Sequence, residues 1–526
     1  MDSGHIAFTL YVGVVVFCLF KFISHRINRA ARQKRLSQEH GCQPIRIKYP
    51  HKDPILGIDV FIRNVKAVSK HNFLETVTRR HEEVGETYQL NMLGTVGTLD
   101  AKKKWWPHLP VPADPKHLDV SGIMTRDDEI IKTILSTRFK DYNLHEERKK
   151  ALKPLLGHGI FSSDGLSWAH SRSLLRPQFA RSQLMDLSML ESHVSCLMKL
   201  IPNGKEIELQ ELLLRFTMDM ATDFLFGEST NSLLADQDGY HSNLEGFAES
   251  VQYAQDRIAM HMALGKWALL KPDPQFKHHV RVVHKFVDEL VHKALHGNDQ
   301  VSKKQPYILL RALVEDTQDP IRIRDEVINI LIAGRDTTAS LISNVFFLLS
   351  KRPELWSMLR NEVLTQFKDQ PPAFEDITQC KYIRYTINEF PINSRVANCD
   401  TILPRGGGVD GKSPLFIPKG TPVIYNVFGL HRRQDVYGPD AEEFKPSRWE
   451  SLRLSWEFLP FNGGPRICIG RIRVEQFALI EASYVLIRFL QLFETIGAKD
   501  DRPWQEKIAL TVSSRNGVRV SFNRAK

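Results

Sequence analysis

The chain has 526 residues and a formal net charge of +10, and its 42% hydrophobic and 25% charged residues exclude disorder of the whole chain. No single face of Lys and Arg dominates, so the charge favours an acidic partner protein or an anionic membrane surface, and we expect no nucleic acid partner. The six cysteines are scattered without a C-x-x-C pair, which argues against a disulfide framework and a zinc site and indicates a reducing compartment.

The amino terminus predicts a membrane anchor over residues 1–23. Residues 6–20, IAFTLYVGVVVFCLF, form one apolar run, and basic residues follow this run. A cleaved signal peptide has its charge first, so we predict one uncleaved span with the amino terminus in the lumen and the remainder in the cytosol. The short span suits the thin membrane of the endoplasmic reticulum. The alternative is a buried core helix, which rarely ends in so dense a basic run.

A basic, proline-containing linker over residues 24–50 leads into one domain over residues 51–526. Helical periodicity covers residues 65–85, 244–264, 279–295 and 324–350. Strand-like alternation is confined to residues 86–93, 414–427 and 508–522, and Arg515-Asn516-Gly517 predicts a terminal hairpin. The expected fold class is therefore mostly α, an α+β domain with small sheets.

Residues 102–125 fit neither period and carry four prolines. An irregular insertion of this length is uncommon inside a compact domain. Its Lys and Trp residues suit a loop that contacts a membrane. The alternative is that this segment does not belong to the working protein.

Residues 406–413, GGGVDGKS, match the pattern of a phosphate-binding loop. That loop needs a strand before it and a helix after it. Here Pro414 follows at once and a strand pattern comes next, so we predict a glycine-rich hairpin and exclude nucleotide hydrolysis.

The most informative segment is FNGGPRICIG, residues 461–470. Phe461, Gly464, Arg466, Cys468 and Gly470 fit F-x-x-G-x-R-x-C-x-G. A glycine-rich loop that leads into a helix can aim backbone N–H groups at a thiolate sulfur. This pattern resembles the signature of the cytochrome P450 family, and the resemblance extends over nearly the whole chain. It implies the P450 fold, a haem b cofactor and Cys468 as the axial ligand of the haem iron.

A second motif, LIAGRDTTAS, lies in the middle of a predicted helix, where Gly334 and two adjacent threonines weaken the helix. It resembles the oxygen-activation motif of the family, with Asp336 and Thr337 as the acid–alcohol pair that delivers protons to dioxygen. Taken alone, these residues would more often form a solvated patch.

Four further residues resemble the family's contacts to the haem propionates. Trp168 and Arg172 in WAHSR are one helical turn apart, and Arg395 and Arg466 lie in PINSRVA and the cysteine loop. Arginine suits a carboxylate because its fork donates two parallel hydrogen bonds. Without Cys468, Trp168 and Arg172 would be read as ordinary core and surface residues.

The chain departs from the family pattern around Glu389. The family has a Glu-x-x-Arg motif whose charges pair with an arginine of the meander segment, and Arg448 in FKPSRW resembles that structural arginine. Here Glu389 is followed three residues later by Ile392, and Pro391 ends the helix. Loss of one member of a buried charge network typically costs about 3–5 kcal/mol.

Residues 471–474 are a second departure, because their removal restores the family spacing after Cys468. With the insertion at 102–125 and the missing arginine, the chain carries three abrupt irregularities. We interpret them as signs of a wrongly assembled coding sequence, in which intron-derived residues are kept and a coding piece is skipped. The alternative is a diverged, inactive relative without haem.

The branch that the sequence resembles most comprises fungal membrane-bound enzymes that hydroxylate n-alkanes and fatty acids. GIFSSDGLSWAHSRSLLRPQFAR and HRRQDVYGPDAEEFKPSRW carry this resemblance. It implies an apolar substrate oxidised with O₂ at or near its chain end, and electrons from an NADPH-cytochrome P450 reductase. A terpenoid or another secondary metabolite is the alternative substrate class.

Overall fold

The helices of the protein make up most of its described part. The computed structural model describes residues 24, 28, 30–53, 57–91, 121–179, 187–235, 246–264, 272–296, 309–377, 392–471 and 477–525. A helix over residues 30–39 comes first. The labelled helices are α2 (Ile58–Ser69), α3 (Phe73–Val84), α5 (Asp128–Lys132), α6 (Glu146–Leu156), α7 (Gly165–Leu175), α9 (Ser188–Lys199), α10 (Leu209–Phe226), α11 (Phe247–Leu264), α12 (Pro274–His296), α13 (Leu309–Asp316), α14 (Pro320–Ser350), α15 (Pro353–Phe367), α16 (Phe374–Ile377), α18 (Val427–Leu430), α19 (Gln434–Tyr437) and α20 (Phe477–Leu492).

The strands of the described residues form four small sheets. One sheet has the order β1 (Thr87–Asn91), β2 (Ser121–Thr125), β8 (Pro422–Asn426), β5 (Ile392–Ala397) and β3 (Tyr142–Asn143). All its pairs are antiparallel except β2 with β8. The others are β4 (Glu206–Glu208) with β12 (Arg519–Arg524) and β9 (Phe493–Ala498), β6 (Thr401–Gly407) with β7 (Ser413–Ile417), and β10 (Glu506–Ile508) with β11 (Val512–Ser514).

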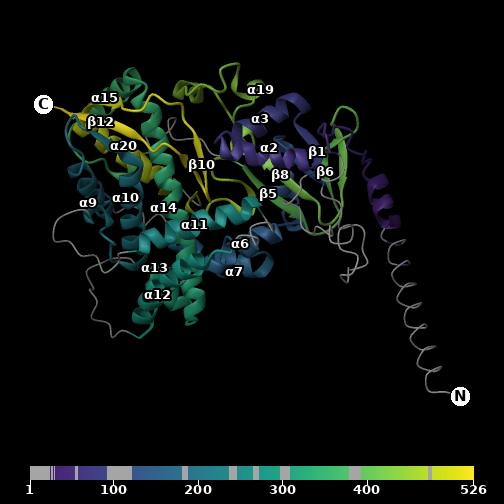
Figure 1. Ribbon diagram of the computed structural model, residues 1–526, viewed down its shortest axis with the longest axis horizontal. Coiled ribbons are helices and arrows are strands. Elements are labelled where there is room, and N and C mark those ends of the chain that lie inside the picture. The colour runs from purple at the N-terminus through teal and green to yellow at the C-terminus, as the bar shows by residue number, and fades with distance from the viewer. Residues whose placement is uncertain are drawn as a thin grey trace.

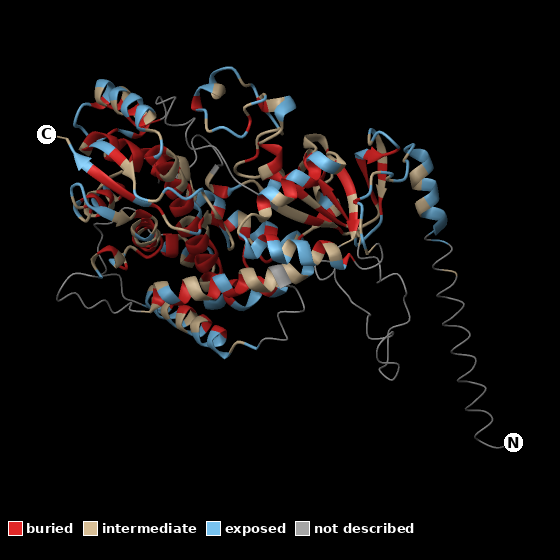
Figure 2. Cartoon of the chain, turned by 45° about the horizontal axis from the view of Figure 1, so that its top comes forward, coloured by how far each residue is buried: buried red, intermediate tan, exposed pale blue. Residues whose placement is uncertain are grey.

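Helix α14 runs through the centre of the molecule. Asp319 caps its amino terminus by accepting hydrogen bonds from the backbone N–H groups of Ile321 and Arg322, and Pro320 occupies the first helical position. The second half of α14 packs with α9, α10, α15 and α20 in one apolar cluster, and its first half packs with α6, α11, α12 and α13 in another. Figure 1 shows the helices gathered at one end and the five-stranded sheet with α2 and α3 at the other. Buried residues run through both parts in Figure 2, and the sheet end has an apolar cluster of its own.

The mostly α fold class is confirmed, and the glycine-rich hairpin is confirmed as well, because β6 and β7 pair across residues 407 and 413. The irregular segment was predicted to extend to residue 125, which is wrong for its last five residues. They form β2, which pairs with β1 and β8. Residues 102–120 lie outside the described residues.

The terminal hairpin is a second correction. β11 pairs with β10, and β12 pairs with β4 and β9, so the turn at Arg515-Asn516-Gly517 joins strands of different sheets. Among the described helices, none combines the length and hydrophobicity needed to cross a bilayer. The predicted anchor over residues 1–23 lies outside the described residues.

Candidate active site

The cysteine loop is held in shape by close backbone packing. Gly464 has φ +67°, and a Cβ atom there would lie 1.7 Å from the carbonyl oxygen of Leu135, so the loop requires glycine at this position. The backbone N–H of Cys468 donates to the carbonyl oxygen of Phe461 at 3.0 Å. Cys468 itself is exposed, whereas the next residue, Ile469, is buried with α14 in one apolar cluster. The loop therefore leaves Cys468 accessible while its neighbour Ile469 is anchored in the core.

The middle of α14 is open to solvent in a helix that is otherwise largely buried. Thr337 is exposed and Gly334 is half-buried, while Asp336 and Thr338 are buried. The Thr337 hydroxyl donates to the carbonyl oxygen of Ala333 at 2.6 Å. A Cβ atom at Gly334 would meet nothing within 4 Å. These observations leave Gly334 and Thr337 uncovered within the motif that the sequence analysis selected.

Asp336 makes contacts away from Thr337. One guanidinium nitrogen of Arg335 lies 2.9 Å from its carboxylate, and the same nitrogen is 3.4 Å from Gln252 Oε1 and 3.5 Å from Gln255 Oε1 on α11. Burial raises the pKa of Asp336, although Arg335 and Gln255 oppose this shift. The predicted acid is therefore tied to α11 through Arg335.

A turn before α7 is locked onto α14. The backbone N–H of His158 donates to Asp325 at 2.7 Å, and the Asn329 amide donates to the carbonyl oxygen of Leu156 at 2.8 Å. Gly157 has φ +54°, and a Cβ atom there would overlap the Asp325 carboxylate. This turn sets the position of α7 and of the two candidate residues that α7 carries.

Trp168, Arg172 and Arg466 come together as the sequence predicted. The Trp168 ring lies 4.6 Å from the guanidinium carbon of Arg466 and 5.8 Å from that of Arg172. Arg466 donates to Asp164 at 2.6 Å and to the carbonyl oxygen of Ser163 at 2.8 Å. Arg172 donates to the carbonyl oxygen of Ile467, the residue before Cys468, at 2.9 Å.

Arg395 joins them from β5, together with an arginine that the sequence analysis did not select. Arg148 of α6 donates to Asn393 Oδ1 at 2.8 Å, and Arg395 donates to the same atom at 3.3 Å. The Nε atoms of Arg148 and Arg395 are buried without a hydrogen-bond partner. Arg148 stands in the run EERKKALK, which looks like a solvated face, and only the tertiary structure shows that it points inward.

We call Arg148, Arg172, Arg395 and Arg466 the arginine cluster. Burial and the other three guanidiniums together lower the pKa of Arg466 to about 10, against the opposing effect of Asp164. Burial and Arg395 likewise lower the pKa of Arg148 to about 10. Asp164 is shared with Lys149 at 3.2 Å, so positive charge exceeds negative charge here. A buried surplus of this kind is suited to a ligand that brings its own carboxylates.

Arg448 lies in a different setting. It donates to Asp440 Oδ1 at 3.0 Å and to the carbonyl oxygens of Tyr437, Asp440 and Glu443 at 2.8, 2.5 and 2.9 Å. Glu389, its predicted partner in the family pattern, lies outside the described residues, and Ile392 is the first residue of β5. The segment 472–476, which includes part of the predicted insertion, also lies outside them.

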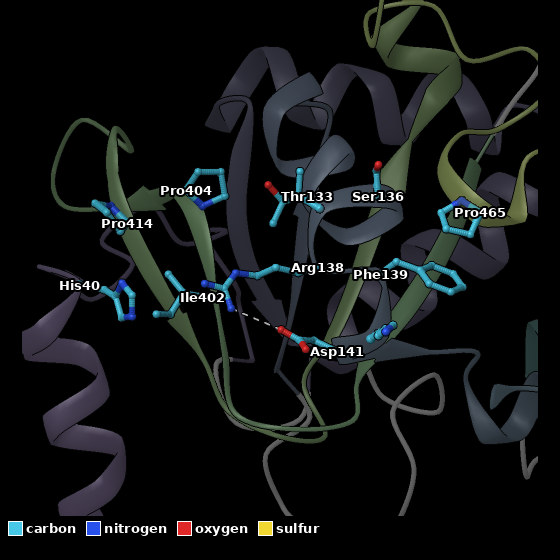
Figure 3. Close-up of a pocket in the computed structure, with 12 residues that line it drawn as sticks. His40, Thr133, Ser136, Arg138, Phe139, Asp141, Ile402, Pro404, Pro414 and Pro465 are labelled. Carbon is cyan, nitrogen blue, oxygen red and sulfur yellow. Dashed lines mark hydrogen bonds and ion pairs between the residues drawn. The ribbon is translucent and has the colours of Figure 1, made fainter. Parts of the chain in front are cut away.

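A cavity of about 880 Å³ lies beside this site and is separate from it. Figure 3 shows it between His40, the β6–β7 hairpin and the turn that carries Arg138 and Asp141, whose ion pair of 3.4 Å is dashed. Pro465 is the only residue of the cysteine loop that lines it.

Comparisons with known proteins agree with the site. The sequence model of the cytochrome P450 family matches residues 121–518. The chain is 44% identical to cytochrome P450 monooxygenase himC of Aspergillus japonicus, over 94% of this chain and 86% of that protein. It is 40% identical to cytochrome P450 monooxygenase fsdH of Fusarium heterosporum, over 92% and 84%. It is 42% identical to cytochrome P450 52A5 of Candida maltosa, over 82% and 86%. The chain therefore belongs to the cytochrome P450 family, whose members are monooxygenases with a haem-thiolate cofactor that receive electrons from a redox partner.

Proposed function

We propose that this monooxygenase hydroxylates fatty acids or n-alkanes at or near the chain end. The observation that carries the haem assignment is the exposed Cys468 next to the arginine cluster, in which Arg466 pairs with Asp164 and positive charge is in surplus. This donor set fits a haem, because the propionates would neutralise the surplus charge and the sulfur would ligate the iron. When bound, the haem supplies the dioxygen chemistry, which a thiolate ligand favours by donating electron density.

The residues of this chain divide the remaining work. Arg148, Arg172, Arg395 and Arg466 would hold the two propionates, and the Trp168 ring would keep Arg172 and Arg466 in place. In the loop, Phe461 provides the carbonyl oxygen that fixes the backbone N–H of Cys468.

Two residues of α14 would handle the proton. The hydroxyl of the exposed Thr337 would hold a proton at Oγ1. Asp336, whose pKa is raised by burial, would hold a proton to be delivered.

The substrate class rests on the resemblance to the fungal n-alkane and fatty-acid hydroxylases and on the 42% identity to cytochrome P450 52A5. The partners we propose are an NADPH-cytochrome P450 reductase, O₂, a small apolar substrate and the lipid bilayer. The net charge of +10 suits an acidic reductase. With residues 1–23 as a single-pass anchor, the domain would face the cytosol from the endoplasmic reticulum.

The first experiment is to express the full chain, reduce it under carbon monoxide and record the Soret band. We expect the band position typical of thiolate-ligated haem, and its loss in Cys468→Ser. A chain without haem would overturn the proposal and favour the inactive relative. Comparison with the cloned transcript then tests the three irregularities, since a transcript that encodes all of them contradicts an error of assembly.

The second experiment identifies the substrate class. Fatty acids and n-alkanes of increasing length are titrated into the haem-loaded chain, and the spin-state change of the Soret band is recorded. We expect saturable changes with fatty acids. Saturation by terpenoids alone would assign the chain to secondary metabolism.

A further inference from the structure

The cavity beside the cysteine loop has an apolar wall. Its volume of about 880 Å³ is that of a site for a small organic molecule. The β6–β7 hairpin contributes Ile402, Pro404 and Pro414 to the lining, as Figure 3 shows. Proline has a fixed φ and no N–H group, so this wall is rigid and offers few hydrogen-bond donors. It is therefore suited to the hydrocarbon part of a ligand.

The opposite wall is a π-helical turn over Thr133–Thr137, which continues α5. The backbone N–H of Arg138 donates to the carbonyl oxygen of Thr133, five residues earlier, at 2.9 Å. Such turns are rare and occur frequently at functional sites. Here Thr133, Ser136 and Thr137 all line the cavity from this one turn. The second wall is therefore polar.

Cations outnumber acids on the lining. Arg138 extends from the π-helical turn toward Ile402 in Figure 3, and Lys140 also lines the cavity. Among the described residues of the lining, Asp141 is the one acid, and it accepts a hydrogen bond from the Thr401 hydroxyl at 2.7 Å. Its ion pair with Arg138 is 3.4 Å long, whereas a close charged pair is about 2.7–2.9 Å. Arg138 is therefore placed to hold the anionic group of a ligand at closer range.

Two residues of the lining connect the cavity to the cysteine loop. Pro465 belongs to the loop, and a Cβ atom at the preceding Gly464 would lie 1.7 Å from the carbonyl oxygen of Leu135 in the π-helical turn. Phe139 packs against Trp168 with 5.4 Å between the ring centroids. A molecule in the cavity therefore touches residues on which the loop rests.

We propose that this cavity binds an amphipathic anion, an alkyl chain with one carboxylate or phosphate group, and that the bound molecule stabilises the cysteine loop. The anionic group pairs with Arg138 and Lys140, and the alkyl chain lies along Ile402 and the prolines. The cavity is separate from the arginine cluster. Its occupancy does not depend on haem or on the substrate, so it is tested separately from the proposed function.

The test locates the bound molecule by photolabelling of the full chain. A diazirine analogue of decanoic acid is added and irradiated, and the labelled peptides are identified by mass spectrometry. We expect labels in residues 133–141 and 402–414, with competition by decanoate and none by its methyl ester. Labels on other peptides, including those of the substrate site, provide the internal reference.

Arg138→Gln should reduce the labelling of residues 133–141 about tenfold, because it removes a charge-assisted pair with the anion. The matched control is Arg405→Gln on β6. Arg405 has 50% of its side chain exposed and pairs with Asp127 at 3.5 Å, but it does not line the cavity. Absence of labels from residues 133–141, or equal labelling of the parent and Arg138→Gln, overturns the proposal, as does equal competition by the methyl ester.

Competition also identifies the source of the anion. Decyl phosphate that competes better than decanoate assigns the cavity to a lipid phosphate, and the reverse order assigns it to a free fatty acid. Should Arg138→Gln fail to fold, Thr137→Trp decides, because it changes an exposed residue and fills the cavity. Labelling of residues 402–414 should then be lost, and labelling that persists contradicts the proposal.

Hydrogen exchange of residues 461–470 measures the effect on the loop, where the backbone N–H of Cys468 donates to Phe461. We expect saturating decanoate to slow this exchange about threefold in the parent and to leave it unchanged in Thr137→Trp. Exchange that decanoate does not change in the parent, or that slows equally in both, overturns the stabilisation of the loop.

Discussion

The meander and the arginine cluster both bury arginine, but they satisfy it differently. Arg448 is matched within its own segment by one carboxylate and three carbonyl oxygens. In the arginine cluster, Arg466 forms an ion pair with Asp164, and the Nε atoms of Arg148 and Arg395 have no acceptor. Since a buried charge is costly unless it is paired, the first arrangement supports the fold, whereas the second is complete only with a ligand.

The comparison distinguishes a structural arginine from one that binds a ligand. Burial alone does not separate a structural from a functional residue, because Arg448 and Arg466 have 10% and 9% of their side chains exposed. The acceptors around the guanidinium separate them. The four predictions below test that distinction.

Replacement of Arg448 should have the largest effect. Arg448→Leu leaves Asp440 and three carbonyl oxygens without their donor, so we expect the free energy of unfolding to fall by about 4 kcal/mol. Urea unfolding followed by circular dichroism measures this. The control is Arg79→Leu, an exposed arginine paired only with Glu75, which should change stability by less than about 0.5 kcal/mol. Equal midpoints for the two variants would contradict a structural role for Arg448.

Glu481 of α20 is the acidic counterpart of the incompletely matched arginines. Its carboxyl is buried near Thr338. Burial raises its pKa to about 8 from 4.5. Between these values the folded chain holds a proton that the unfolded chain has released, so stability falls as pH rises through this window. Glu481→Gln removes this penalty, and we expect it to stabilise the protein by about 3 kcal/mol at pH 7 and by nothing at pH 4.

Urea unfolding at the two pH values measures the effect of Glu481→Gln. The exposed Glu494→Gln serves as the control and should match the parent at both. A stability difference that is the same at pH 4 and pH 7 would show that Glu481 is ionised in the folded chain.

Replacement of Arg148 tests whether the arginine cluster serves to bind a ligand and not to stabilise the fold. Arg148→Leu removes one cation from a surplus, so the protein without haem should keep or gain stability, while haem is lost about tenfold faster, a change of about 1.4 kcal/mol. Transfer of haem to apomyoglobin measures the rate. Lys150→Leu on the same helix, with 66% of its side chain exposed, should leave the rate unchanged. A strongly destabilised Arg148→Leu apoprotein would show that Arg148, like Arg448, has a structural role.

Local patterns predicted much of this site. Phe461, Arg466 and Cys468 belong to one loop, and Trp168 and Arg172 to one helical turn, so fixed spacing in the sequence becomes fixed spacing in space. Arg148 could not be found in this way, because it lies among lysines and its partner Asn393 is 245 residues away. The link from Asp336 through Arg335 to α11 could not be predicted either, because Gln255 lies 80 residues from Arg335 in the sequence.

The predictions of secondary structure also succeeded for local features and failed for features set by distant contacts. Periodicity predicted the long helices and the glycine-rich hairpin, whose partners are close in sequence. It missed β2, because Ser121–Thr125 pairs with β8 across about 300 residues and is preceded by a segment without a period. It also joined the last two strands as a hairpin. β11 instead pairs with its preceding neighbour β10, and β12 pairs with the distant β4 and with β9.

The smallest expected effect concerns Gln255, which lies near Asp336. This buried acid is intermediate between the fully matched Arg448 and the incompletely matched arginine cluster. Its carboxylate has one cation, Arg335, and Arg335 is in turn held by Gln255 and Gln252 of α11. Gln255 opposes the rise in the pKa of Asp336. Gln255→Leu should therefore raise this pKa further and loosen Arg335.

For Gln255→Leu we expect the alkaline limb of the turnover profile to move to higher pH, and about three times more NADPH to be consumed without product. Product formed per NADPH across the pH range measures both effects, with haem content and substrate titration as controls for folding. Gln252→Leu is the matched variant, because Gln252 is only half-buried and contacts Arg335 and the exposed Asp256. Since the effect acts through the carboxylate, adding Gln255→Leu to Asp336→Asn should change nothing. Additive losses in that double variant would mean that Gln255 shapes α11 and does not position the acid.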